Sequence, residues 1–303
     1  MRPAAKLGGL ALVVAIVFGA AYWIGKVVGP VAAEPPPAAA EHEGMGETAE
    51  EGHGGGHGAG TDVPKGLQVS EGGGTLAVLT AGAGAGQRAA FAFRILDEDG
   101  HAVTDFQPTH DKLMHLIVAR RDLSGFQHVH PEMAADGTWT VPLTFAAAGD
   151  FRVFADFQRA GEDEGHTLGA DVAVTGAYQP VPLPPAALTA TVGEYRVTLS
   201  GTLEPGTSSK LTLSVDKGGV PVTDLQPYLA AYGHLVALRQ GDLAYLHVHP
   251  DGEPGDGKTK PGPNIVFYAE VPSTGTYRLY LDFKHGDTVR TAEFTAVASE
   301  HGH

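Results

Sequence analysis

The chain has 303 residues, of which 43% are hydrophobic and 18% charged, and 35 acidic side chains outnumber 20 of Lys and Arg. Binding of nucleic acid requires clustered cations, so an acidic chain without a basic cluster argues against nucleic acid as a partner. The absence of cysteine excludes disulfides, thiolate metal sites and cysteine nucleophiles. The 15 histidines are the unusual feature of this composition.

The first segment of the chain is apolar. Residues 7–25 are uncharged and follow Arg2 and Lys6, and at about 1.5 Å per residue they reach across the ~30 Å hydrocarbon core of a bilayer. The positive-inside rule places everything after them outside the cytoplasm. We therefore expect a single-pass membrane anchor within residues 1–30 and extracytoplasmic domains after it. The alternative is a signal peptide cleaved after residues 31–33, which gives a secreted protein.

Three further segments lack the composition of a folded domain. Residues 31–64 are rich in Pro, Ala, Gly and Glu and are predicted to form a disordered linker. Residues 179–186 are dense in proline and are expected to separate two domains. Residues 299–303 form a short histidine tail. The histidines of the linker and the tail are His42, His53, His57, His301 and His303.

An internal repeat divides the rest of the chain into two copies. The segment His128-Val129-His130-Pro131 recurs 119 positions later as His247-Val248-His249-Pro250. Other pairs at the same spacing are Val103-Thr104-Asp105 with Val222-Thr223-Asp224, His115-Leu116 with His234-Leu235, and Arg120 with Arg239. These ordered matches indicate a duplication. Short runs of β-branched and aromatic residues, bounded by Gly, Pro or Asp, predict an all-β fold of two tandem Ig-like β-sandwich domains, residues 65–178 and 187–298.

The first copy has three histidines whose spacing brings them together in a β-hairpin. Side chains alternate between faces along a strand, so His128 and His130 share one face. A two-residue loop at Arg121-Asp122 places His115 directly opposite His128, where cross-strand Cβ atoms are about 5 Å apart. His130 then lies diagonally, one pleat further along. We predict that these three imidazoles form a metal site.

The second copy repeats this pattern. The same spacing places His234 opposite His247 and brings His249 beside them. Three convergent imidazoles are harder to explain by packing than a single histidine, because each nitrogen needs a partner. Imidazole-only ligation suits Cu(II), Zn(II) or Ni(II), and the affinity order favours copper, so a copper or zinc ion is the predicted cofactor. The alternative is a network of structural histidines.

Four other side chains are weaker hypotheses for metal ligands. Asp156 and Asp282 recur in equivalent strands, where a carboxylate can bind the metal, accept a hydrogen bond from a ligand, or simply cap a strand end. His166 and His285 follow those strands without equal spacing and are considered as extra ligands. His110 has no counterpart in the second copy and is expected on the surface.

Three motifs of the second copy carry a resemblance to known proteins. They are residues 218–224 (GGVPVTD), 232–236 (YGHLV) and 246–250 (LHVHP). With their counterparts in the first copy, they resemble a family of exported bacterial proteins that share features with YtkA-like and CopC-like Ig-fold domains found near heavy-metal handling systems. The resemblance covers both copies and implies an Ig-like fold and a copper-related role.

These observations lead to one leading hypothesis and two alternatives. We expect a membrane-anchored, extracytoplasmic protein that binds copper or zinc through a three-histidine site in each copy and buffers, senses or delivers the metal. Its expected partners are the metal ion, the membrane and a metal-transport protein. Enzymatic activity is not expected, because few repeated acid–base groups accompany the histidines. The alternatives are a structural or adhesive Ig-like surface protein and a metal-dependent enzyme with a three-histidine centre.

Overall fold

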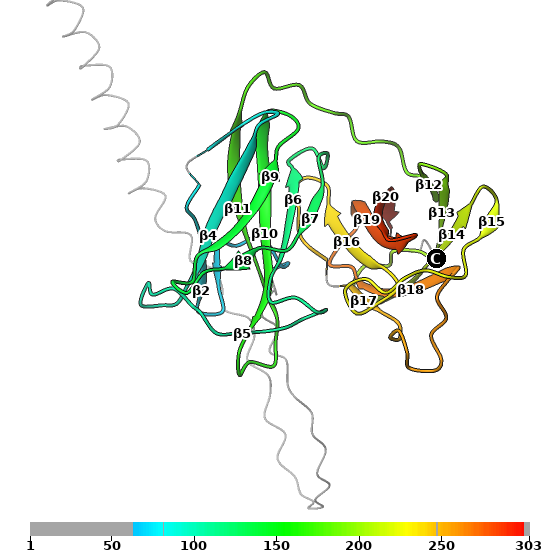
Figure 1. Cartoon of the computed structure of the whole chain (residues 1–303). Coiled ribbons are helices and arrows are strands. Elements are labelled where there is room, and N and C mark those ends of the chain that lie inside the picture. Colours follow the sequence, from blue (N-terminus) through cyan, green and yellow to red (C-terminus); the bar gives the residue numbers. More distant parts are fainter. Residues whose placement is uncertain (1–62, 81, 247, 300–303) are drawn as a thin grey trace, which may run out of the picture. The chain divides into compact units, whose positions relative to one another are not determined.

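The computed structural model describes residues 63–80, 82–246 and 248–299 (Figure 1). The predicted membrane anchor, most of the predicted linker, His247 and the histidines of the tail lie outside these residues. No helix in the described part of the chain has the length and hydropathy needed to cross a membrane. Both repeats belong to one compact unit of the chain, Gly60–His303.

The first repeat is a sandwich of two sheets. Its first sheet has the strand order β1-β2-β4-β9-β8, and its second has the order β3-β11-β10-β6-β7, with β5 paired to β10. The strands of the first sheet are β1 (Ser70–Glu71), β2 (Gly74–Val78), β4 (Arg88–Leu96), β9 (Trp139–Thr144) and β8 (Glu132–Met133). Those of the second are β3 (Ala83–Gly84), β11 (His166–Thr175), β10 (Gly149–Arg159), β6 (His115–Arg120), β7 (Gln127–Val129) and β5 (Phe106–Gln107).

The core of this repeat lies between the two sheets. Along β9, buried and exposed residues alternate over the whole strand, which is typical of a strand with one face on a core. Phe93 and Trp139 stack there with ring centroids 6.4 Å apart, and both are buried. Full burial of a large apolar side chain contributes about 1.5–3 kcal/mol, so burial of these two aromatic residues stabilises the sandwich.

The second repeat is built in the same way. One sheet has the order β12-β13-β14-β18-β17, with β15 paired to β14, and the other has the order β16-β19-β20. Their strands are β12 (Thr189–Val192), β13 (Tyr195–Ser200), β14 (Ser208–Lys217), β15 (Val220–Pro221), β18 (Asn264–Glu270), β17 (Val248–Pro250), β16 (His234–Arg239), β19 (Gly275–His285) and β20 (Thr288–Ala298).

The strand order of both repeats is that of an Ig-like sandwich. One sheet follows the A-B-E-D order, as β2-β4-β9-β8 and as β13-β14-β18-β17. The facing sheet follows the G-F-C order, as β11-β10-β6 and as β20-β19-β16. The predicted all-β fold of two tandem Ig-like β-sandwich domains is confirmed.

The hairpin between β6 and β7 differs from the prediction by two residues. Ile117, rather than His115, pairs with His128, so the predicted pairing is wrong. The Arg120 N–H bonds the Ser124 oxygen at 2.9 Å and closes a turn longer than two residues. A shift of two residues leaves each side chain on its original face. His115 and His128 therefore still share one face of the sheet.

The corresponding segment of the second repeat follows another path. Beside β16 its described residues form a single bridge, between Leu238 and Tyr245. The strand β17 then pairs with β18 of the opposite sheet, where His249 lies opposite Tyr268. The predicted hairpin that aligns His249 with the strand of His234 is therefore wrong. The prediction fails because the chain passes to the opposite sheet earlier in the second repeat, so that β17 pairs with β18. In the first repeat the equivalent strand, β7, still pairs with β6.

The outer faces of β6 and β16 are in contact between the two repeats. All six residues of β6 are buried, which requires a cover on both faces of the strand. Its outward residues Ile117 and Ala119 belong to an apolar cluster that also contains Val236 and Leu238 of β16. The repeats are therefore joined by a second, smaller core.

Two aromatic contacts related by the internal repeat extend this core. Phe126 stacks on Tyr280 with ring centroids 3.9 Å apart, and Phe154 packs against Tyr245 at 5.6 Å. The Tyr280 hydroxyl also donates to the Leu123 oxygen at 2.6 Å. Because each repeat contributes the same two positions, the contact resembles the self-complementary interface of a two-fold dimer.

The chain segment that precedes β1 crosses this junction. The Lys65 oxygen accepts a 2.9 Å hydrogen bond from the Tyr245 N–H of the second repeat. The Gly66 oxygen accepts two bonds from the Arg152 guanidinium, at 2.9 and 2.7 Å. Gly66 has a left-handed φ of 74°, and a Cβ there would lie 2.6 Å from the Phe154 ring. Only glycine fits this crossing.

Gly66→Ala is expected to lower the free energy of unfolding by about 2–5 kcal/mol, because the left-handed conformation costs Ala about 1–2 kcal/mol and the collision with Phe154 costs about 1–3 kcal/mol more. Gly86→Ala is the matched control, since Gly86 has a φ of 75° and an added Cβ meets nothing within 4 Å. Urea unfolding of both variants measures the difference. Equal losses of stability would contradict the close approach at Gly66.

Candidate functional site

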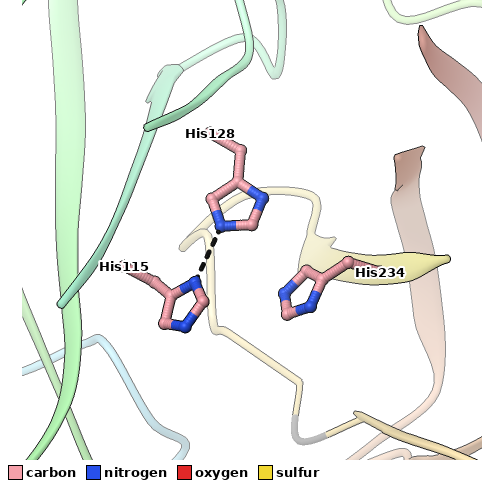
Figure 2. Close-up of side chains that lie close together, drawn as sticks. All are labelled: His115, His128 and His234. Atoms are coloured by element: carbon pink, nitrogen blue, oxygen red, sulfur yellow. Dashed lines mark hydrogen bonds between the residues drawn. The ribbon is translucent and has the colours of Figure 1, made fainter. Parts of the chain in front are cut away.

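Three histidines from the two repeats meet at the junction (Figure 2). Each of His115, His128 and His234 offers one ring nitrogen, and the three nitrogens lie within 4.8 Å of one another. The ring centroids are 5.3, 4.7 and 5.5 Å apart. Imidazoles bound to one tetrahedral ion, with metal–nitrogen bonds of about 2.0–2.1 Å, have centroids about 5 Å apart. The triad is therefore already close to the geometry of a metal site.

The facing strands explain why these residues meet. His115 is the first residue of β6 and His234 the first residue of β16, so packing the two strands face to face brings the ends together. Their rings are stacked with an interplanar angle of 4°. His128 comes from β7, which pairs with β6 and adds the third imidazole.

Hydrogen bonds to the outer nitrogens determine the tautomers of two rings. The Nε2 of His115 lies 2.9 Å from the main-chain carbonyl oxygen of Thr109. A carbonyl oxygen only accepts hydrogen bonds, so Nε2 carries the proton and the Nδ1 of the neutral ring is bare. The Nδ1 of His128 lies 2.9 Å from the carboxylate of Asp282 and donates a hydrogen bond to it, so the Nε2 of a neutral His128 ring is bare. This Nε2 faces the Nδ1 of His115 at 3.1 Å, within hydrogen-bond distance (Figure 2). Two lone pairs at this distance repel each other unless a proton or a metal cation lies between them.

Asp282 acts across the junction. It belongs to the second repeat but orients His128 of the first, and the two side chains are 4% and 1% exposed. Its other oxygen accepts a 2.5 Å hydrogen bond from the Thr291 hydroxyl. A carboxylate that accepts the outer N–H of a ligating imidazole is the usual support of a histidine metal ligand. Asp282 thus accepts the hydrogen bond that would orient His128 as a metal ligand.

A fourth imidazole borders the triad. The His130 ring lies 5.0 Å from that of His115 and 4.9 Å from that of His128. Its buried Nε2 has no hydrogen-bond partner among the described residues. Buried nitrogens are rarely left without a partner, so His130 is the side chain best placed to supply a further ligand.

The cluster favours neutral imidazoles. Burial, and then the neighbouring His128, lower the pKa of His115 to about 3. The same two causes lower the pKa of His130 to about 4. Burial and the surrounding imidazoles also lower the pKa of His234. At neutral pH these three rings carry no charge, and neutral imidazole is the form that binds metal.

The second predicted triad is not assembled in the described part of the chain. His234 joins the histidines of the first repeat, and His249 is exposed on β17. His247 lies outside the described residues. The separate site expected in the second copy is thus replaced, for His234, by a site that both copies share.

The weaker hypotheses fall in different places. Asp156 is the cross-strand partner of His115 and accepts long hydrogen bonds from the hydroxyls of Thr167 and Tyr245, at 3.3 and 3.5 Å. It borders the cluster without belonging to the triad. Two further histidines lie elsewhere, and the structure does not support them as extra ligands. They are His166, which bonds Glu162 at 2.6 Å, and His285, which bonds Tyr195 and Asp224 at 2.8 and 3.1 Å.

Reasoning from the sequence missed the shared nature of the site. A signal for it was present in the two strands that carry His115 and His234. Each histidine is followed by apolar residues at every position up to the arginine, as HLIVAR and HLVALR. A strand of a two-layer sandwich with one exposed face alternates instead. Continuous apolar runs in both copies therefore indicate that the outer faces are covered.

The fold and the site together define a tandem Ig-like protein with a histidine centre shared between its repeats. The chain belongs to the family described as a domain of unknown function, DUF8832, whose model matches residues 69–176 and 190–300. Each repeat is therefore one copy of the family domain.

The solved structures that match this chain include bacterial adhesins. The adhesin InvE of Yersinia pseudotuberculosis is 12% identical with a TM-score of 0.23, and the match covers 75% of this chain and 59% of that one. The Escherichia coli adhesin FdeC is 14% identical with a TM-score of 0.25, over 78% and 67% of the chains. Invasin, an integrin-binding protein, is 15% identical with a TM-score of 0.21, over 74% and 39%. No curated protein matches the sequence.

The stability of metal-free protein is expected to fall as the pH drops from about 7 to about 4.5. The ordinary pKa of 6.5 applies to His115 in the unfolded chain, whereas the folded value is about 3. The unfolded chain therefore binds protons first, and the stability present above pH 6.5 is lost towards pH 3. The slope is at most about 1.4 kcal/mol per pH unit for one histidine.

Urea unfolding with a chelator present, at several pH values, checks this expectation. His115→Gln should flatten the slope, because it removes one such group. His101→Gln is the control, since the His101 side chain is 79% exposed. Identical slopes for the wild type and His115→Gln would show that His115 is not held neutral by its surroundings.

Proposed function

We propose that this protein binds a divalent transition-metal ion, copper or zinc, through one centre that both repeats build. The ligands are His115 and His128 of the first repeat and His234 of the second, with His130 beside them. The observation that carries the proposal is the 3.1 Å distance between the Nδ1 of His115 and the Nε2 of His128. In tetrahedral coordination with bonds of about 2.0 Å, two ligand nitrogens lie about 3.3 Å apart.

The donor set favours a borderline divalent ion. Imidazoles are the donors at the centre, and imidazole suits Cu(II) and Zn(II). Met114, next to His115 in sequence, lies in the core of the first repeat with 1% exposure, so its thioether is packed among apolar side chains. A role in holding soft Cu(I) is therefore less well supported than a role for a divalent ion.

The cellular role follows from the expected location. If the apolar run near the N-terminus anchors the chain or directs its export, the centre meets metal outside the cytoplasm. A chain with a net charge of −15 attracts cations. We propose a buffering, sensing or delivery role at the cell envelope, with a metal-transport protein as the partner, and we attribute no catalytic step to the centre.

A structural role is the second candidate, and one observation favours it. The bond between His128 and Asp282 joins the two repeats directly, with both side chains buried. In that case the histidines hold the repeats together and need no metal. The two candidates differ in how the melting temperature responds to metal, because only a ligand that binds the folded state raises it.

His128→Ala and His234→Ala are each expected to weaken binding of Zn(II) by 100-fold or more, because each removes a ligand from the same ion. A background lacking His42, His53, His57, His301 and His303 removes loosely bound metal. Isothermal titration of the full chain in that background measures the affinity, and His101→Ala is the matched control. Two independent sites would instead leave half of the binding intact in each variant.

Asp282→Asn is expected to weaken Zn(II) binding by about 10–100-fold, as found when the acceptor behind a ligating histidine is lost. The variant keeps the shape of the side chain and retains an oxygen for Thr291. The melting temperature is measured with and without Zn(II) to separate the two candidate functions. A large loss of stability without any effect of metal on either protein would support the structural role.

A further inference from the structure

Each of the two facing sheets places an aspartate beside a cluster histidine. Asp156 of β10 is the cross-strand partner of His115, and Asp282 of β19 is the cross-strand partner of His234. Cross-strand partners share a face, so both carboxylates point to the same side as the cluster. The internal repeat makes the two positions equivalent.

The carboxylates of Asp156 and Asp282 differ in the groups that donate hydrogen bonds to them. Asp282 accepts from the His128 imidazole at 2.9 Å and from a hydroxyl at 2.5 Å. Among the described residues, the hydrogen-bond donors to Asp156 are the hydroxyls of Thr167 and Tyr245, at 3.3 and 3.5 Å. No ion pair joins Asp156 to any side chain in the described residues. A carboxylate removed from water is costly without a cationic partner. Positive charge on Lys65 and His110 acts on Asp156, but neither side chain forms an ion pair with it, so this position suits a further cation.

His110 lies on the same side of the cluster. Its ring centroid is 5.5 Å from that of His234 and 6.0 Å from that of His115. The ring contacts of His130, in contrast, are with His115 and His128. His130 and His110 therefore border different pairs of rings of the triad.

The backbone at His110 shows that the histidine is not needed for folding of the loop. His110 has a left-handed φ of 48° and Asp111 one of 65°. The equivalent loop of the second repeat has the same left-handed pair, Leu229 with φ 55° and Ala230 with φ 59°. Leu229 is buried there, whereas His110 is exposed at the edge of the cluster. The same loop thus serves packing in one repeat and presents an imidazole in the other.

A single ion cannot use all of these donors. Five imidazoles and the Asp156 carboxylate offer more ligands than the four that a zinc or copper site of this kind takes. The donors also fall into two groups, because the triad and His130 together supply the four ligands of one ion. His110 and Asp156 remain on the other side, next to the exposed edge.

We propose that the centre holds a second divalent transition-metal ion, bound by His110 and Asp156 beside the ion of the histidine triad. This inference rests on the proposed function. Water occupies the remaining positions of the second ion, which leaves it open to exchange. The inner ion has a closed imidazole shell. The centre therefore combines a tightly held ion with one that another molecule can take.

The test uses Cu(II) and the full chain in the background that lacks His42, His53, His57, His301 and His303. After treatment with a chelating resin, copper per chain is measured by mass spectrometry. Electron paramagnetic resonance then reports whether two Cu(II) ions are close enough to couple. We expect two ions per chain, a resonance signal smaller than the copper content, and a half-field transition.

Two variants remove the second ion by different means. His110→Leu introduces the residue that the second repeat carries at this position, and Asp156→Asn removes charge but keeps the acceptor for both hydroxyls. Each is expected to bind one uncoupled Cu(II) with full signal intensity. His101→Leu is the matched control and should retain two coupled ions.

The outcomes separate this inference from the function on which it rests. One copper per chain that is lost in His128→Ala but kept in His110→Leu would overturn the second ion and leave the first in place. Two coupled ions that persist in both His110→Leu and Asp156→Asn would overturn the assignment of its ligands. No copper retained in the background protein would overturn the proposed function itself.

Discussion

The packing of β6 against β16 is the contact on which the rest of this structure depends. Both strands are apolar on both faces, so each sandwich has an outer surface that must be covered. The cluster of Ile117, Ala119, Val236 and Leu238 covers it by joining the repeats. Because His115 and His234 begin these strands, the same packing that buries apolar surface also brings two imidazoles to 5.5 Å. The site is a direct result of how the repeats associate.

This association also determines the chemistry of the histidines. The acceptor that orients His128 comes from the other repeat, and burial keeps the neighbouring rings neutral. The facing nitrogens of His115 and His128 are thereby held 3.1 Å apart in a buried site. Any ion bound there contacts both repeats, so its binding free energy adds to the free energy that holds them together. Metal binding and repeat association are linked by this geometry in the proposed function.

The two copies have not remained equivalent around the junction. In the first, β7 pairs with β6 and carries His128 into the cluster. In the second copy, the equivalent strand β17 belongs to the opposite sheet, where it pairs with β18. His110 stands where the second copy has Leu229, and Asp156 lacks the imidazole partner that Asp282 has. A duplicated domain has thus produced one asymmetric centre, in which the first repeat supplies most of the described ligands.

The sequence by itself determined the duplication, the Ig-like strands and the shared face of His115, His128 and His130. These follow from local rules, namely the period of two along a strand and the matching order of motifs. Only the tertiary structure decided the hairpin register. The turn after Arg120 contains Leu123 in a left-handed conformation, which a leucine in the sequence does not predict. It also decided that His234 joins His115 and that Asp282 supports His128, 154 positions away. These contacts arise from the docking of two whole faces, and no local pattern encodes which faces will meet.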